Sequence, residues 1–165
     1  IYTHYPNKTK LVEDCVVGLF HEISSGIDCI CALQKNPIEE LYEIKKFILN
    51  QLKGEKTSPS YQLQKYYPKI HKSLYGKQFK VTQDCVLDNL IRGLEQGIYR
   101  ENLSKKIETR LSISAVASVK DNVLFPVTDF PRATLMDEYL EYHIRGIVTP
   151  KGRKILNKII NSNQE

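Results

Sequence analysis

The sequence predicts an all-α fold, and three observations support this prediction. Apolar residues recur at the i, i+3 and i+4 spacing of a helical face through most of the chain. Residues that begin and end helices, such as Asn36-Pro37 and Gly97, stand at the boundaries of these segments. Strand patterns are nearly absent: only SISAVASV, residues 112–119, has β-leaning composition, and its position between a helix cap and a loop favours a helix.

The first helix is expected from about Lys8 to Ser24. The side-chain oxygen of Asn7 can cap it, and Gly26 is expected to end it. Its apolar face comprises Leu11, Val12, Cys15, Val16, Leu19, Phe20 and Ile23. Pro6 favours an extended backbone at the preceding residue, so the chain should turn sharply into this helix.

Proline-containing caps then mark three further helices. Asn36-Pro37-Ile38-Glu39 combines a capping Asn, a Pro at the first helical position and a Glu at the third, and this helix should run to Gly54. Ser58-Pro59 repeats the pattern for a short helix that ends near Tyr66. The longest helix should span residues 68–97, between a Pro and a Gly.

The C-terminal third predicts three more helices. One begins at Asn102 or Ser104 and carries an apolar face to residue 119. A loop rich in Pro and Asp, KDNVLFPVTDFPR, separates it from a helix over residues 135–147. Thr149-Pro150 caps the last helix, whose apolar residues keep the same spacing.

Composition indicates a globular domain. The chain has 165 residues, of which 41% are hydrophobic and 26% charged, enough for one domain with a core of its own. The net charge of +5 permits an anionic partner without requiring one, because 19 acidic residues are interspersed with 24 basic residues. No apolar run approaches the roughly 18 residues of a membrane span, and the start lacks a signal-peptide layout. We therefore expect a cytoplasmic protein without a membrane contact.

Cysteine and histidine spacing predicts no metal centre and no cofactor. The four cysteines, which are too few and too irregularly spaced for a disulfide framework, are Cys15, Cys29, Cys31 and Cys85. The C-x-C pair at 29 and 31 suits a redox or metal pair, but in a short apolar stretch its residues more often pack as small hydrophobes. The histidines, at positions 4, 21, 71 and 143, show no ligand spacing. With no nucleophile elbow, phosphate loop or dinucleotide motif, we expect no enzyme.

Three stretches resemble a known family. They are Y-x-H-Y-x-x-K-x-x-L at residues 2–11, EQGIYRENLSKKIETRLSI at 95–113 and YLEYHIRGIVTPKGRKIL at 139–156. Together they resemble the TetR/AcrR family of transcriptional regulators, in the form found in Bacteroidetes: the end of the helix-turn-helix, the "G-aromatic-R" before a capped dimerisation helix, and an "R-G-I-x-T-P-K-G" ending. Residues 27–94 match only in helix lengths and in the LQKYYPKI junction.

The resemblance implies a TetR-like C-terminal helical bundle that dimerises through a four-helix interface. Residues 1–6 would be a remnant of the helix-turn-helix domain, and residues 7–165 a ligand-binding and dimerisation domain with a linker helix over 7–25. The family's first two helices and most of its third have no counterpart here, so we expect a fragment or processed form that does not bind an operator specifically by itself. The implied function is that of a ligand-responsive regulator, a repressor, which binds operator DNA when intact and responds to a small apolar effector.

The resemblance places Tyr2, His4 and Lys8 near the DNA backbone. A phenol and an ammonium group at a helix N-terminus suit phosphate oxygens, and the helix dipole adds to the attraction. The alternative is that these side chains pack at the junction, as we expect for Tyr5.

The expected effector site and dimer interface lie in the helices that follow. Six side chains with aromatic rings, most of them with a polar end group, are clustered within residues 61–79. They suit an apolar ligand held by a few hydrogen bonds: Tyr61, Tyr66, Tyr67, His71, Tyr75 and Phe79. Several of these could instead fill core or surface positions at a helix junction. Helices over 104–119 and 134–147 should form the dimer interface through Leu111, Ala115, Leu135, Tyr139, Leu140, His143 and Ile144.

Two other classes of function remain open from the sequence. The first is a helical adaptor that binds another protein and has no effector. An apolar groove without a closed cavity would support this class. The second is a small helical enzyme. A cluster of acidic residues or histidines with perturbed pKa values in a cleft would support this class.

Overall fold

The fold is all-α, as the sequence predicts. The computed structural model describes residues 6–51 and 59–162, and the side chains of these residues other than 59–62. The described residues contain seven helices and no strand: α1 (Lys8–Ala32), α2 (Pro37–Gln51), α3 (Pro59–Tyr66), α4 (Pro68–Glu95), α5 (Lys105–Val119), α6 (Arg132–Ile147) and α7 (Pro150–Ser162). Residues 112–119 are helical, in line with the preference for a helix there.

Side-chain caps begin the helices where the sequence places them. The side-chain oxygen of Asn7 accepts a hydrogen bond from the backbone N–H of Lys10, at 2.8 Å. Asn36 accepts from the N–H of Ile38 at 3.0 Å, and Ser104 caps α5. Each of these bonds satisfies an N–H group that the first helical turn leaves without a partner.

The predicted end of α1 at Gly26 is wrong, since the helix continues to Ala32. A Cβ at Gly26 would overlap the ring of Phe47 on α2. The glycine therefore permits close packing of two helices rather than ending one. Gly97 does end α4 as predicted, and its φ of +66° is one that glycine adopts without strain.

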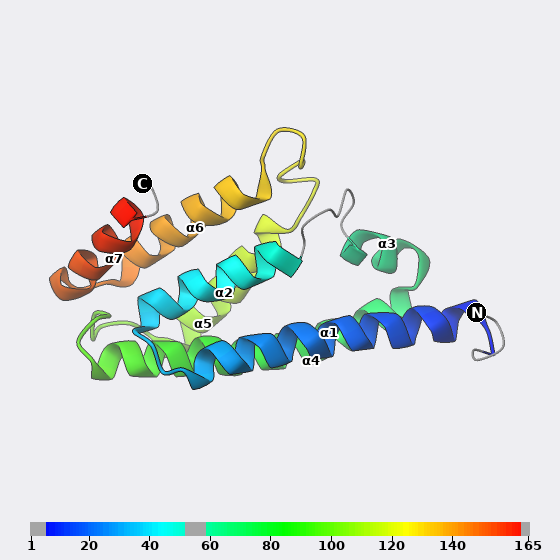
Figure 1. The fold of residues 1–165 in the computed structure, drawn as a ribbon, viewed down its shortest axis with the longest axis horizontal. Helices are drawn as coiled ribbons and strands as arrows, with labels where there is room; N and C mark the ends of the chain where they lie inside the picture. Colours follow the sequence, from blue (N-terminus) through cyan, green and yellow to red (C-terminus); the bar gives the residue numbers. More distant parts are fainter. Residues whose placement is uncertain (1–5, 52–58, 163–165) are drawn as a thin grey trace.

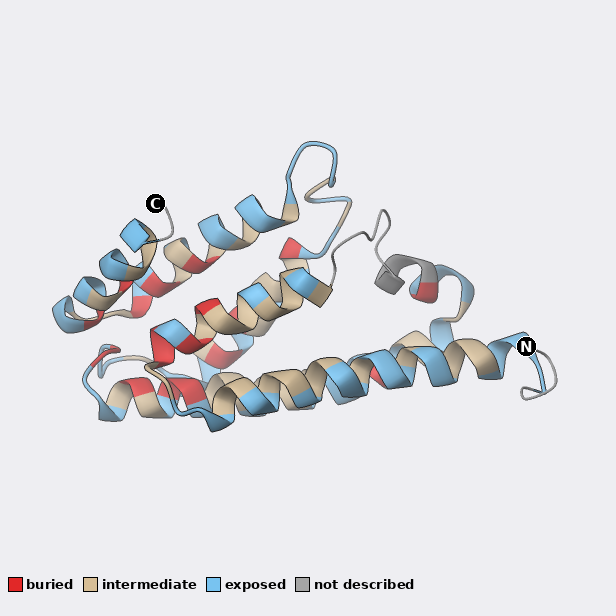
Figure 2. Cartoon of the chain, viewed as in Figure 1, coloured by how far each residue is buried: buried red, intermediate tan, exposed pale blue. Residues whose placement is uncertain are grey.

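The helices form an elongated bundle in which α1 and α4 run side by side in the same direction (Figure 1). Helix α2 packs on both, α5 packs on α4, and α6 and α7 close the opposite side. Buried residues gather where α2, α6 and α7 meet the C-terminal end of α4 (Figure 2). The core is therefore concentrated at one end of the bundle.

Residues 97–100, after α4, meet residues 147–152, where α6 ends and α7 begins, in this core. The N–H of Arg100 donates to the carbonyl of Ile147 at 2.9 Å, and the N–H of Thr149 donates to the carbonyl of Ile98 at 2.9 Å. A Cβ at Gly152 would overlap the Ile98 carbonyl oxygen. This junction, residues 97–100 against 147–152, fixes α6 and α7 against the end of α4.

A buried polar network supports the same end. Glu40 on α2 is fully buried, and both of its oxygens accept hydrogen bonds from Arg92 on α4, at 2.5 and 2.6 Å. The amide of Asn89 donates to Glu40 at 2.8 Å and to the carbonyl of Pro37 at 2.9 Å. The hydroxyl of Tyr99 donates to Asn89 at 2.9 Å. A buried charge costs little stability only when it is paired and hydrogen-bonded in this way.

Candidate functional site

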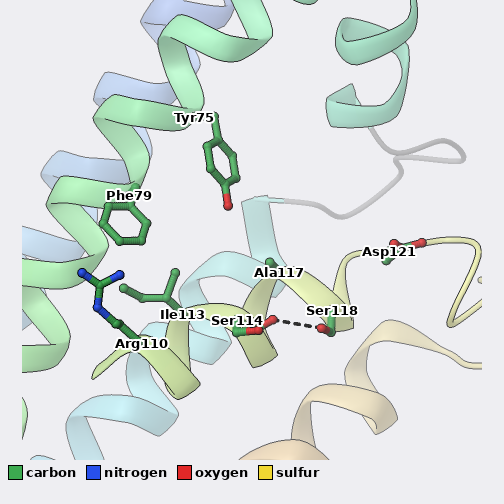
Figure 3. Close-up of a pocket in the computed structure, with 8 residues that line it drawn as sticks. All are labelled: Tyr75, Phe79, Arg110, Ile113, Ser114, Ala117, Ser118 and Asp121. Atoms are coloured by element: carbon green, nitrogen blue, oxygen red, sulfur yellow. Dashed lines mark hydrogen bonds between the residues drawn. The ribbon is translucent and has the colours of Figure 1, made fainter. Parts of the chain in front are cut away.

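The candidate site is a hollow of about 340 Å³ between α4 and α5 (Figure 3). Two aromatic residues of α4 form one wall, and the hydroxyl of Tyr75 points toward α5. The lining residues are Tyr75, Phe79, Arg110, Ile113, Ser114, Ala117, Ser118 and Asp121. A volume of this size lies at the lower end of the range for small-molecule sites.

Helical spacing explains why one face of α5 lines the hollow. Its contributing positions, 110, 113, 114, 117 and 118, follow the i, i+3, i+4, i+7 pattern of a single helical face. Three of them are Ser or Ala, whose small side chains leave space below the rings of Tyr75 and Phe79.

Arg110 is the polar group best placed to bind a ligand there. It is exposed and, among the described residues, has no carboxylate within ion-pair distance. Asp121 is occupied by its own loop, because its carboxylate accepts hydrogen bonds from the N–H groups of Val123 and Leu124 at 2.7 and 3.3 Å. The Ser118 hydroxyl donates to the carbonyl of Ser114 at 2.9 Å. A guanidinium group beside the apolar side chains of Phe79 and Ile113 suits an organic anion.

The structure brings some of the expected effector residues together and separates others. Tyr75 and Phe79 both line the hollow. His71 is half-buried one turn away, with its ring stacked on Tyr75 at 6.2 Å between centroids. Tyr66 is 63% exposed, and the Lys65 ammonium lies over its ring.

Of the two remaining expected residues, the one whose side chain is described does not line the hollow. Tyr67 is the half-buried residue that precedes α4, and the side chain of Tyr61 lies outside the described residues. The sequence-based prediction of this site rests on aromatic residues, so it does not include α5, whose lining residues Ser114, Ala117 and Ser118 are small. The feature of the sequence that indicates this face of α5 is the helical i, i+4 spacing of Arg110, Ser114 and Ser118.

Helices α5 and α6 are joined by a polar contact centred on His143. Its Nε2 lies 3.3 Å from the Ser112 hydroxyl, and its Nδ1 lies 3.5 Å from a carboxylate oxygen of Glu108. The ring of Tyr139 stacks on it at 5.6 Å. Burial lowers the pKa of His143, and the nearby Glu108 carboxylate opposes that shift.

The residues expected at a dimer interface divide into two groups. Leu111 is 57% exposed and, with Ile107 at 60%, forms an apolar strip along α5. Four others are half-buried: Ala115, Leu135, Tyr139 and His143. Leu140 and Ile144 belong to the core of the protomer, with exposed fractions of 8% and 0%, so they are not available to a partner in this conformation.

The DNA-facing prediction is only partly within the described residues. Lys8 is exposed at the first position of α1, whose first turn contains no acidic residue. Lys10 is paired with Asp14 at 2.9 Å and with Glu13 at 3.4 Å. Tyr2 and His4 lie outside the described residues.

Helix α1 is long and apolar enough to cross a membrane, by length and composition alone. The lengths of the apolar runs in the sequence do not predict this, because Glu22 and Asp28 divide the apolar stretch. A core helix of a soluble protein, or a signal sequence, has the same length and composition. None of the residues of α1, all of which the structure describes, is buried in the protomer.

No group of three metal-ligating side chains occurs among the described residues. In comparisons with known proteins, no family model matches the chain, and neither a curated protein nor a solved structure matches it.

Proposed function

We propose that the chain is the effector-binding and dimerisation part of a ligand-responsive transcriptional regulator, a repressor of the TetR type. The observation that carries the proposal is the arrangement around α5. One face of this helix lines the hollow, the adjacent face carries the exposed strip of Ile107 and Leu111, and the next face contacts α6. A ligand site and a surface for a second copy are thus neighbours on one helix.

The other wall of the hollow connects the site to α1. Helix α4 supplies Tyr75 and Phe79 and also packs along α1. A ligand that binds one position of α4 more tightly than another therefore shifts the population of α1 orientations. In a dimer, the separation of two DNA-binding heads attached to α1 would change with it, and such heads must meet successive major grooves about 34 Å apart.

The lining favours a small organic anion with an apolar body. Phe79, Ile113 and Ala117 offer apolar surface, and Arg110 offers a guanidinium group for a carboxylate or a similar anionic group. This proposal replaces the apolar effector that the aromatic residues alone suggest, because Arg110 of α5 adds a positive charge to the same hollow.

A chimera tests the proposed function. Residues 6–165 are joined to the DNA-binding head of a TetR-type repressor whose operator is known, and operator binding is measured by fluorescence anisotropy. We expect the chimera to bind far more tightly than the isolated head, because the chain supplies the dimer. Leu111→Asp should abolish the gain, whereas Leu33→Asp, which changes a similarly exposed leucine between α1 and α2, should not. A chimera that binds no better than the head alone contradicts the proposal and favours the adaptor.

The same chimera tests the expected role of Lys8. Loss of one phosphate contact per subunit lowers the slope of log affinity against log salt by about 0.9 for each contact, so by nearly 2 for a dimer. Lys8→Ala should therefore weaken binding to every DNA sequence alike and leave specificity unchanged. An unchanged salt slope would show that Lys8 does not face the DNA.

A further inference from the structure

Two cysteines from different helices lie in contact. The sulfur of Cys31, in the last turn of α1, is 3.7 Å from the sulfur of Cys85 on α4. Both side chains are half-buried, and both cysteines are free thiols. The C-x-C spacing in the sequence directs attention to Cys29 as the partner of Cys31, but Cys29 is exposed on α1, and the structure pairs Cys31 with Cys85 instead.

We propose that Cys31 and Cys85 form a reversible disulfide that ties α1 to α4. A disulfide has sulfurs about 2.0 Å apart, so the two atoms must approach by about 1.7 Å from their present separation. Changes of side-chain rotamer at two half-buried positions can supply a movement of this size. The contact is a specific one, because the other two cysteines, Cys15 and Cys29, are exposed elsewhere on α1.

The oxidant is a small-molecule disulfide such as oxidised glutathione, and the exchange balances. The thiolate of Cys31 attacks one sulfur of the small disulfide, its S–S bond breaks, and one small thiolate leaves. The thiolate of Cys85 then attacks the sulfur of Cys31 in the mixed disulfide and displaces the second small thiolate. The two protons lost by the protein end on the two small thiols. The protein loses two electrons and the small disulfide gains them.

The environment of the pair sets the rate of this reaction. Burial raises the pKa of both thiols, and the Glu40 carboxylate adds to the shift. Only a small fraction of each is thiolate at neutral pH, so oxidation should be slow near pH 7 and accelerate by about tenfold for each pH unit above it. The pair should therefore respond to sustained oxidising conditions rather than to brief ones.

The crosslink would restrict the packing of α1 on α4, through which effector binding is proposed to change the orientation of α1. If α1 transmits effector binding as proposed above, the disulfide holds it in one orientation relative to α4. The formation of the disulfide does not depend on that function, and its test is independent of DNA, ligand and dimer.

The test uses the folded 165-residue chain incubated with oxidised glutathione at pH 8, followed by alkylation of free thiols and peptide mapping. We expect a crosslink between the peptides that contain Cys31 and Cys85, and its loss on treatment with dithiothreitol. The oxidised chain should unfold at a temperature higher by about 10 °C, because the bond closes a loop of more than 50 residues in the unfolded chain.

Variants give the matched controls. Cys15→Ser/Cys29→Ser removes the two exposed thiols and should form the crosslink to the same extent. Adding Cys85→Ser should leave Cys31 as a glutathione adduct and abolish the rise in unfolding temperature. The proposal is overturned if the native chain collects glutathione adducts without a crosslink, if the crosslink joins Cys15 or Cys29, or if Cys31 and Cys85 react only after unfolding. Peptide mapping of the chain without substitutions tests the proposed crosslink even if a variant fails to fold.

Discussion

The hydroxyl of Tyr99 donates a hydrogen bond of 2.9 Å to the side-chain oxygen of Asn89, and both residues are buried. Through Asn89 this bond connects the loop after α4 to Glu40 on α2. Every described buried side-chain N or O atom has a partner.

Tyr99→Phe should destabilise the domain by about 1–3 kcal/mol, because it leaves the buried Asn89 oxygen without a donor. The free energy of unfolding in urea, measured by circular dichroism, checks this. Tyr142→Phe is the control, since Tyr142 is 82% exposed. Equal stability of both variants would show that the Tyr99 bond contributes nothing net.

Gly152→Ala should destabilise the domain by about 1–3 kcal/mol, because the new methyl group would overlap the Ile98 carbonyl and a backbone atom cannot swing away. Gly146→Ala is the matched control. It adds the same methyl group at an exposed position of α6, where no atom lies within 4 Å, and should be neutral or stabilising by up to about 1 kcal/mol. Urea unfolding of the two variants should therefore give effects of opposite sign or clearly different size.

Local signals predict much of the fold. Asn7, Asn36 and Ser104 cap helices because a short polar side chain meets free N–H groups, a relationship that depends on near neighbours alone. The wrong prediction that α1 ends at Gly26 has a different origin. Whether a glycine ends a helix or allows close packing depends on what lies opposite, and here Phe47 is 21 residues away in the sequence.

The candidate site was less predictable than the fold. Tyr75 and Phe79 are one turn apart on α4, and their composition alone suggested a ligand site. Arg110 reaches the same hollow only because α5 packs on α4, which no local pattern specifies. The contact between Cys31 and Cys85 is hidden for the same reason, since it joins residues 54 positions apart.

Stability should fall as the pH drops below 6.5. Burial lowers the pKa of His143 below the usual 6.5, so the unfolded chain binds a proton more readily than the folded one. The stabilising contribution is therefore complete above pH 6.5 and is lost as pH falls toward the folded-state pKa, by at most about 1.4 kcal/mol per pH unit. His143→Gln should flatten urea-measured stability between pH 7 and 5. His21→Gln, at an exposed position on α1, should leave the slope intact; identical slopes in the two variants would contradict the assignment.

Arg110→Gln should weaken binding of 1-anilinonaphthalene-8-sulfonate, an aromatic anion, by about tenfold, because it removes a charge-assisted hydrogen bond. Fluorescence titration measures the affinity. Ala117→Leu should also weaken binding, since it fills the hollow, whereas Arg153→Gln, an exposed arginine on α7, should not. If Arg110 and Arg153 variants bind the probe equally, the anion does not occupy the α4–α5 hollow.

The proposed regulator requires that the chain pair with a second copy through α5 and α6, and sedimentation velocity tests this most directly. At about 20–50 μM, where an interface of standard size should hold, we predict a single species of twice the 19.1 kDa chain mass. Leu111→Asp should convert it to a monomer, because it places a charge in the apolar strip. Leu33→Asp, on the connection between α1 and α2, should leave it dimeric. A 19.1 kDa monomer for the unmodified chain, or a dimer that Leu111→Asp does not disturb, would contradict the account.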